Sequence, residues 1–104
     1  LSVVFLALVL MDVVLACVNF YLYQKQKNNK GFISKSDIEM YQKEFNSLDK
    51  YFSNLFNEEG KYMEDTFGET TNSLIVWNKK NYKVYLNLNF SNGANGSIYL
   101  ELNI

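Results

Sequence analysis

Carboxylates are the main candidates for chemistry in this chain. Two adjacent pairs, Glu58-Glu59 and Glu64-Asp65, lie in polar stretches of sequence, where such side chains are expected to be solvated. The chain contains no histidine, and its one cysteine, Cys17, lies inside an apolar segment. A nucleophile–histidine pair or a zinc site therefore cannot be assembled. We expect no catalytic residue, no metal-binding residue and no cofactor.

Other binding chemistries also lack their usual residues. The chain has no glycine-rich phosphate loop, because Asn92-Gly93 and Asn95-Gly96 are dipeptides typical of hairpin turns. The net charge of −1 gives no basis for binding nucleic acid. A single cysteine allows no intramolecular disulfide and is expected to be a small buried side chain. We expect neither nucleic acid nor a small-molecule substrate as a partner.

Two triplets near the C-terminus match the acceptor sequence for N-linked glycosylation. They are Asn89-Phe90-Ser91 and Asn95-Gly96-Ser97, which lie close together on one expected hairpin. Chance explains such triplets equally well in a chain this rich in asparagine. Asn89 and Asn95 are therefore possible glycosylation sites.

Asp12 is a carboxylate in the middle of an apolar stretch. Such a residue costs roughly 2.5–3.5 kcal/mol on membrane-insertion scales, so it needs compensation. A partner cation, the N-terminal amine of a neighbouring chain, or protonation would each provide it. Shielding by an adjacent helix is an equally good interpretation.

The segment around Asp12 is the most informative part of the chain. The first 23 residues, Leu1 to Tyr23, contain only two strongly polar side chains, Asp12 and Asn19. A helix of this length spans roughly 35 Å, enough to cross a hydrocarbon layer of about 30 Å. The segment lacks the basic start and cleavage site of an intact signal peptide, so we expect an upstream leader to have been removed. Residues 1–29 are predicted to form a hydrophobic helix, transmembrane or in a filament core, with a bend at 28–31.

A second helix is expected over about residues 35–58. Ser34 and Ser36 are each followed three residues later by an acid, which indicates its start, and Gly60 is the expected stop. Its apolar residues recur at spacings of three and four, as on one face of a helix. This stripe can pack on the chain's own sheet or on another helix, and its aromatic residues favour the sheet. The stripe consists of Ile38, Tyr41, Phe45, Leu48, Phe52 and Leu55.

After residue 72 the apolar period changes from 3.6 to 2, which indicates antiparallel strands with one buried face. Strands are expected at about 73–77, 82–90 and 97–104, whereas residues 60–72 are interpreted as irregular. The predicted fold class is α+β. It consists of a long N-terminal hydrophobic helix, a bend, an amphipathic helix and a C-terminal three-stranded antiparallel β-meander. Residues 30–104 form one small globular domain in this prediction.

This order of elements resembles type IV pilins and pseudopilins. Mature chains of that family open directly on an apolar helix and end in a domain with an antiparallel meander. Bacterial members usually carry a glutamate at the fifth mature position, where this chain has Phe5. Leu1-Ser2 followed by an unbroken apolar run is similar instead to archaeal-type members, and certain minor pseudopilins also lack the acid.

The resemblance implies a structural protein and not an enzyme. Its N-terminal helix would anchor a precursor in the cytoplasmic membrane and later pack with identical subunits in a helical filament at the cell surface. Bundling many copies would bury the apolar helix at roughly 25 cal/mol per Å². The positions implied in filament-core packing are Leu1, Phe5, Leu8, Asp12, Leu15 and Asn19.

A second function remains open from the sequence. The chain could be a single-pass accessory subunit of a multi-subunit membrane complex. Lys25, Lys27 and Lys30 follow the apolar segment directly, and basic flanks tend to stay on the cytoplasmic side. That placement would put the C-terminal domain inside the cell, contrary to a pilin. A membrane-anchored enzyme is the least supported interpretation.

Overall fold

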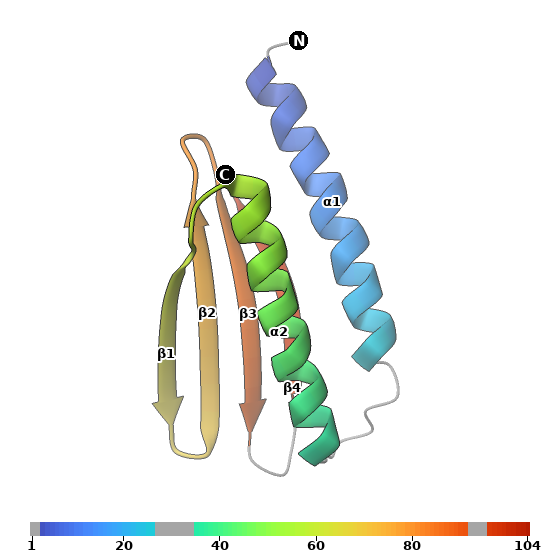
Figure 1. Ribbon diagram of the computed structural model, residues 1–104, viewed down its shortest axis with the longest axis vertical. Coiled ribbons are helices and arrows are strands. Elements are labelled where there is room, and N and C mark those ends of the chain that lie inside the picture. Colours follow the sequence, from blue (N-terminus) through green and yellow to red (C-terminus); the bar gives the residue numbers. More distant parts are fainter. Residues whose placement is uncertain (1–2, 27–34, 92–95) are drawn as a thin grey trace.

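The protein, in a computed structural model that describes residues 3–26, 35–91 and 96–104, combines two helices with one antiparallel sheet (Figure 1). Helix α1 (Val3–Gln26) is followed by helix α2 (Lys35–Phe56) and then by four strands. The strands are β1 (Lys61–Phe67), β2 (Thr70–Asn78), β3 (Lys83–Ser91) and β4 (Gly96–Asn103), and their order in the sheet is β1-β2-β3-β4. The predicted α+β class is confirmed, but the meander has four strands and not three. The bend predicted at 28–31 lies outside the described residues.

Strand β1 replaces the irregular segment predicted at 60–72. It pairs antiparallel with β2, and Gly68 and Glu69 join the two strands. Gly68 has a φ of 63°, as the first residue of a type II′ hairpin turn requires. Every residue of β1 is exposed, so no apolar alternation marked the strand in the sequence. Pairing with β1 also lengthens β2 beyond the predicted 73–77.

Helix α2 ends earlier than predicted, at Phe56 and not at residue 58. Asn57 adopts the left-handed conformation with a φ of 55°. Its amide donates to the carbonyl of Asn54 at 3.3 Å, and the amide of Glu58 donates to the carbonyl of Ser53 at 3.1 Å. These two bonds form a Schellman motif, with asparagine in the position where glycine is commonest. Asn57, and not Gly60, therefore ends the helix.

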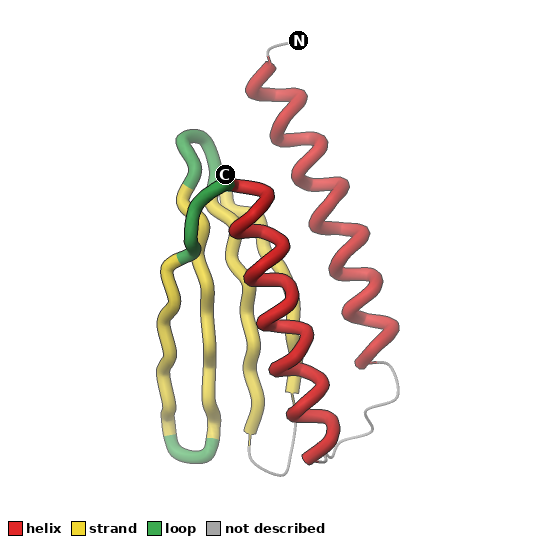
Figure 2. The backbone as a smooth tube through the Cα atoms, in the orientation of Figure 1, coloured by secondary structure: helices red, strands yellow, loops and turns green. Residues whose placement is uncertain are grey.

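The core lies between α2 and the inner face of the sheet (Figure 2). The stripe on α2 packs on the chain's own sheet, as its aromatic content favoured, although Leu55 is exposed. The strands contribute alternate residues that stand opposite one another, such as Ile75 with Leu86 and Leu86 with Leu100. Trp77 is fully buried and its ring centroid lies 5.6 Å from that of Phe52. Alternation along β3 and β4 thus predicted the buried face correctly.

Gly60 has a different role from the predicted one. A Cβ added there would lie 2.8 Å from Cε2 of Trp77 and would collide with the Cγ2 methyl of Ile75. The backbone at Gly60 therefore lies directly against two buried side chains, in a space that only glycine fits. Because glycine has no side chain, the segment that joins α2 to β1 can pass directly against the core.

Replacing Gly60 by alanine should destabilise the protein by about 2 kcal/mol, because the added methyl overpacks the site around Trp77. The free energy of unfolding can be followed in denaturant by the fluorescence of Trp77, the chain's single tryptophan. Gly68→Ala is the matched control: it meets no atom within 4 Å and bears only the strain of a positive φ, about 1 kcal/mol. An equal or smaller loss for Gly60→Ala would contradict this assignment.

Candidate functional site

The surface of helix α1 is the outstanding candidate for function. The helix is 24 residues long and is the one described helix that is long and apolar enough to cross a membrane. Only Leu15 and Leu22 of its residues are buried. Helices in the core of a soluble protein are mostly buried, whereas most of the apolar surface of this helix is exposed. Its exposed large apolar residues are Val3, Val4, Phe5, Leu6, Val9, Leu10, Val13, Phe20, Tyr21 and Tyr23.

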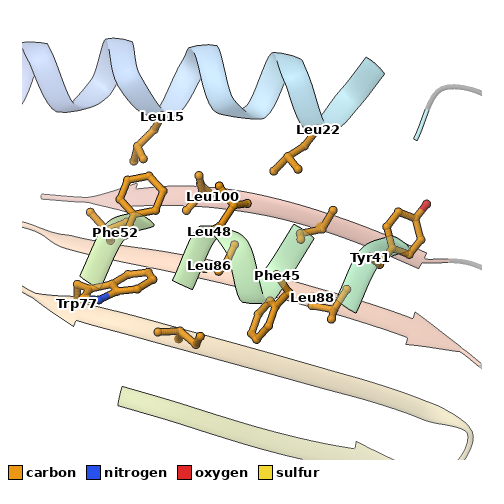
Figure 3. Packing of buried hydrophobic residues seen from close by; sticks show 13 residues of the cluster. Leu15, Leu22, Tyr41, Phe45, Leu48, Phe52, Trp77, Leu86, Leu88 and Leu100 are labelled. Atoms are coloured by element: carbon orange, nitrogen blue, oxygen red, sulfur yellow. The ribbon is translucent and has the colours of Figure 1, made fainter. Parts of the chain in front are cut away.

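One strip of α1 is covered by the chain itself. Leu15 and Leu22, seven residues apart, point from the helix toward the core (Figure 3). Met11, Val14 and Val18 are partly buried against the same cluster. These positions recur every three or four residues and therefore define one face of the helix. The opposite face carries the exposed apolar residues.

Two side-chain amides fix this covered strip to the edge of β4. Asn19 Nδ2 donates to the carbonyl oxygen of Leu100 at 2.8 Å, and the amide of Leu100 donates to Asn19 Oδ1 at 2.7 Å. Gln26 repeats the pattern at Ile98: its Nε2 donates to the carbonyl oxygen at 3.0 Å, and the amide donates to Oε1 at 3.1 Å. Each amide thus binds both backbone groups of one residue, as a neighbouring strand would.

The spacing of these residues explains why a helix can bond to a strand in this way. β4 is the last strand in the sheet order, so the backbone groups of alternate residues on its outer side lack a strand partner. Ile98 and Leu100 are two such positions, two residues apart. Asn19 and Gln26 are seven residues apart and therefore lie on the same side of α1. We refer to these four residues as the β4 clamp.

The residues predicted for filament-core packing fall into three groups. Leu15 and Asn19 are engaged with the chain's own sheet, Leu15 by burial and Asn19 through the β4 clamp. Phe5 and Asp12 are exposed and Leu8 is half-buried. Leu1 lies outside the described residues. Contacts between copies remain a prediction for all six positions, but two of them already have a role within the subunit.

The C-terminal part of α1 carries a group of aromatic and basic side chains. Phe20, Tyr21 and Tyr23 are exposed, and Lys25 Nζ lies 5.5 Å from the ring centroid of Tyr21. The Tyr21 hydroxyl donates to Glu44 Oε1 of α2 at 3.0 Å. Aromatic and basic residues are typical of the boundary between lipid and water. This end of α1 is therefore suited to that boundary.

The possible glycosylation site Asn89 lies on the outer face of the sheet. It alternates with the buried Leu88 along β3 and stands opposite Asn72 and Ser97 on the neighbouring strands. No helix covers this face in the described part of the chain (Figure 1). A glycan on Asn89 would therefore project to solvent. Asn95, the other predicted site, lies outside the described residues.

The carboxylates are distributed without a reactive arrangement. Asp49 accepts a hydrogen bond from the Ser53 hydroxyl at 3.2 Å, and Ser53 in turn accepts one from Trp77 Nε1 at 3.3 Å. Glu58 pairs with Lys79 at 3.0 Å. Within residues 3–26, 35–91 and 96–104, no three histidine, cysteine or acidic side chains gather as metal ligands. These contacts stabilise the fold, and the expectation of no catalytic residue stays a prediction.

No family model, no curated protein and no solved structure matches this chain. Asn19 stood out in the sequence as a polar residue in an apolar segment. Gln26 did not, because it follows that segment among other polar residues.

Replacing Asn19 by leucine should open one half of the β4 clamp and leave the other half closed. The amide of Leu100 loses its acceptor, so its hydrogen exchange should accelerate by about tenfold or more, whereas the amide of Ile98 should stay protected by Gln26. Gln26→Met should produce the reverse pattern. Residue-resolved hydrogen exchange on the full chain measures both.

Gln24→Met is the matched control, since Gln24 is exposed on the same helix. It should change neither amide. Equal protection of Leu100 in the wild type and in Asn19→Leu would show that Asn19 does not bond to β4.

Proposed function

We propose that this chain is the structural subunit of a helical cell-surface filament and polymerises through α1. The observation that carries the proposal is the exposed apolar face of α1. Leu10 and Val13 near its middle are 57% and 54% exposed, in a segment without a polar face of its own. Such a surface must be covered by lipid or by protein.

The two faces of α1 suit a filament built from identical subunits. The covered strip holds the sheet and α2 to one side of the helix through Leu15, Leu22 and the β4 clamp. The other face is free to pack against the α1 helices of further copies. Bundled helices would then form the core, and the sheets would coat the outside. An open helical polymer follows when each contact joins different surfaces and does not close.

The proposal also accounts for the end of α1 that extends past the sheet (Figure 1). The first α1 residue packed against the core cluster is Met11, so Val3–Leu10 lie before the packed region. In a bundle these residues would contact other copies of α1. Asp12 lies at the start of the packed region and is exposed. Its partner in this proposal is a cation of a neighbouring subunit.

Before assembly the same helix would anchor the subunit in the cytoplasmic membrane. Its length and composition suit a membrane span, and its aromatic and basic end suits the interface. A single-pass accessory subunit of a membrane complex would use the same properties. The two functions differ in what covers α1: identical chains in a filament, and unrelated chains or lipid in a complex.

The wild-type chain should form filaments visible by electron microscopy when detergent is removed, and Leu10→Lys should prevent this. A lysine in the helix bundle would place an unpaired charge in apolar surroundings at a cost of roughly 3 kcal/mol, which corresponds to a more than tenfold loss of polymer. Sedimentation of the polymer gives the amount.

Phe67→Lys provides the control. Phe67 is a large apolar residue that is 84% exposed, but it lies on β1 and far along the chain from α1. This variant should polymerise like the wild type. Discrete particles from the wild type, or equal loss of polymer in both variants, would contradict polymerisation through α1.

A further inference from the structure

We infer that α1 has two mutually exclusive positions, one docked on the edge of β4 and one released into lipid, and that Asn19 and Gln26 form the latch between them. The inference rests on the proposed function for the meaning of the two positions. The docked position belongs to the assembled subunit, and the released position belongs to the membrane-anchored one.

The part of α1 that could cross a membrane overlaps the part that is docked. Among the described residues, Val3–Leu10 precede the first one that packs against the core, and this segment is about 12 Å long at 1.5 Å per residue. The hydrocarbon layer is about 30 Å thick. The candidate span in α1, Val3–Gln26, includes Leu15 and Asn19. Both are engaged with the sheet in the docked position.

The sheet cannot follow α1 into the hydrocarbon. β4 carries Glu101 and Asn103 beside the residues that α1 contacts, and both side chains are exposed. Charged side chains and backbone groups without partners are strongly disfavoured in lipid. The domain therefore stays in water, and a spanning α1 has to separate from β4.

The β4 clamp is the polar part of the interface that distinguishes the two positions. Lipid replaces the contacts of Leu15 and Leu22 on the helix side when the helix inserts, but their apolar neighbours on the domain, such as Leu100, then face water, so these contacts also favour the docked position. The four hydrogen bonds of Asn19 and Gln26 have no equivalent in lipid. Outside the membrane they satisfy an edge strand that would otherwise be open. They therefore favour the docked position wherever lipid is absent.

Release has a consequence for the exposed edge of the sheet. In the membrane-anchored subunit the backbone groups of Ile98 and Leu100 face water and can pair with another strand. Docking closes that edge as the subunit leaves the membrane. The latch thereby couples the exit of α1 from lipid to the completion of the subunit's own fold.

A distance measurement within one chain tests the inference. Cys17, the chain's only cysteine, is exposed on α1 and not buried as predicted from the sequence. Glu101→Cys adds a second exposed labelling position on β4. Spin labels at both positions, diluted with unlabelled chain, report the α1–β4 distance by double electron–electron resonance. The full chain is measured in phosphatidylcholine–phosphatidylglycerol nanodiscs and again after lipid and detergent are removed.

We expect one short, narrow distance distribution without lipid and a longer, broader one in nanodiscs. The double variant Asn19→Leu with Gln26→Met should lower the ratio of docked to released chains without lipid by about tenfold or more, because four hydrogen bonds are lost. Gln24→Met, on the exposed face, should leave both distributions unchanged.

A short distance in both environments, or a long one in both, would overturn the two positions. An unchanged ratio in the double variant would overturn the assignment of the latch to Asn19 and Gln26. Since the distance is intramolecular, these results hold whether or not the lipid-free particles are filaments. Failure of the proposed function would appear separately, as discrete particles in electron micrographs.

Discussion

The structure depends on how one apolar helix is covered. α1 has almost no polar surface of its own over its first 18 residues, and its own domain buries only one strip of it. That strip is held by Leu15 and Leu22 and by two side-chain amides that bond to the edge of β4. Everything that the chain leaves exposed on α1 has to be covered by lipid or by other chains. The proposed function follows from this requirement, since the described residues offer no comparable surface elsewhere.

The two edges of the sheet are protected from unwanted strand pairing in different ways. At β4 a helix supplies the missing hydrogen bonds through Asn19 and Gln26. At β1 the strand is exposed and carries Lys61, Glu64 and Asp65, whose charges disfavour pairing with another strand. The edge at β4 is therefore closed by side chains of a helix, whereas the edge at β1 is protected by its composition alone.

The sequence predicted those features whose signal is local. Alternation in β3 and β4 and the stripe on α2 each arise from one buried face, and both predictions are confirmed except at Leu55, which is exposed. β1 was missed because an edge strand exposed on both faces leaves no alternation, although the glycine of its two-residue turn is a short-range signal. Asn19 was visible as a polar residue in an apolar segment, but its partner Leu100 lies 81 residues further along the chain. Contacts between residues far apart in the sequence depend on the fold and leave no local signal. The close contact between Gly60 and Trp77 is another such contact.

A helical reconstruction of the native assembly by cryo-electron microscopy tests the account most directly. The account predicts a density in which the exposed face of α1 contacts the α1 helices of identical chains, while the opposite strip holds the sheet at β4 on the outside. A density in which α1 stands alone in lipid, or is surrounded by unrelated polypeptides, would contradict it.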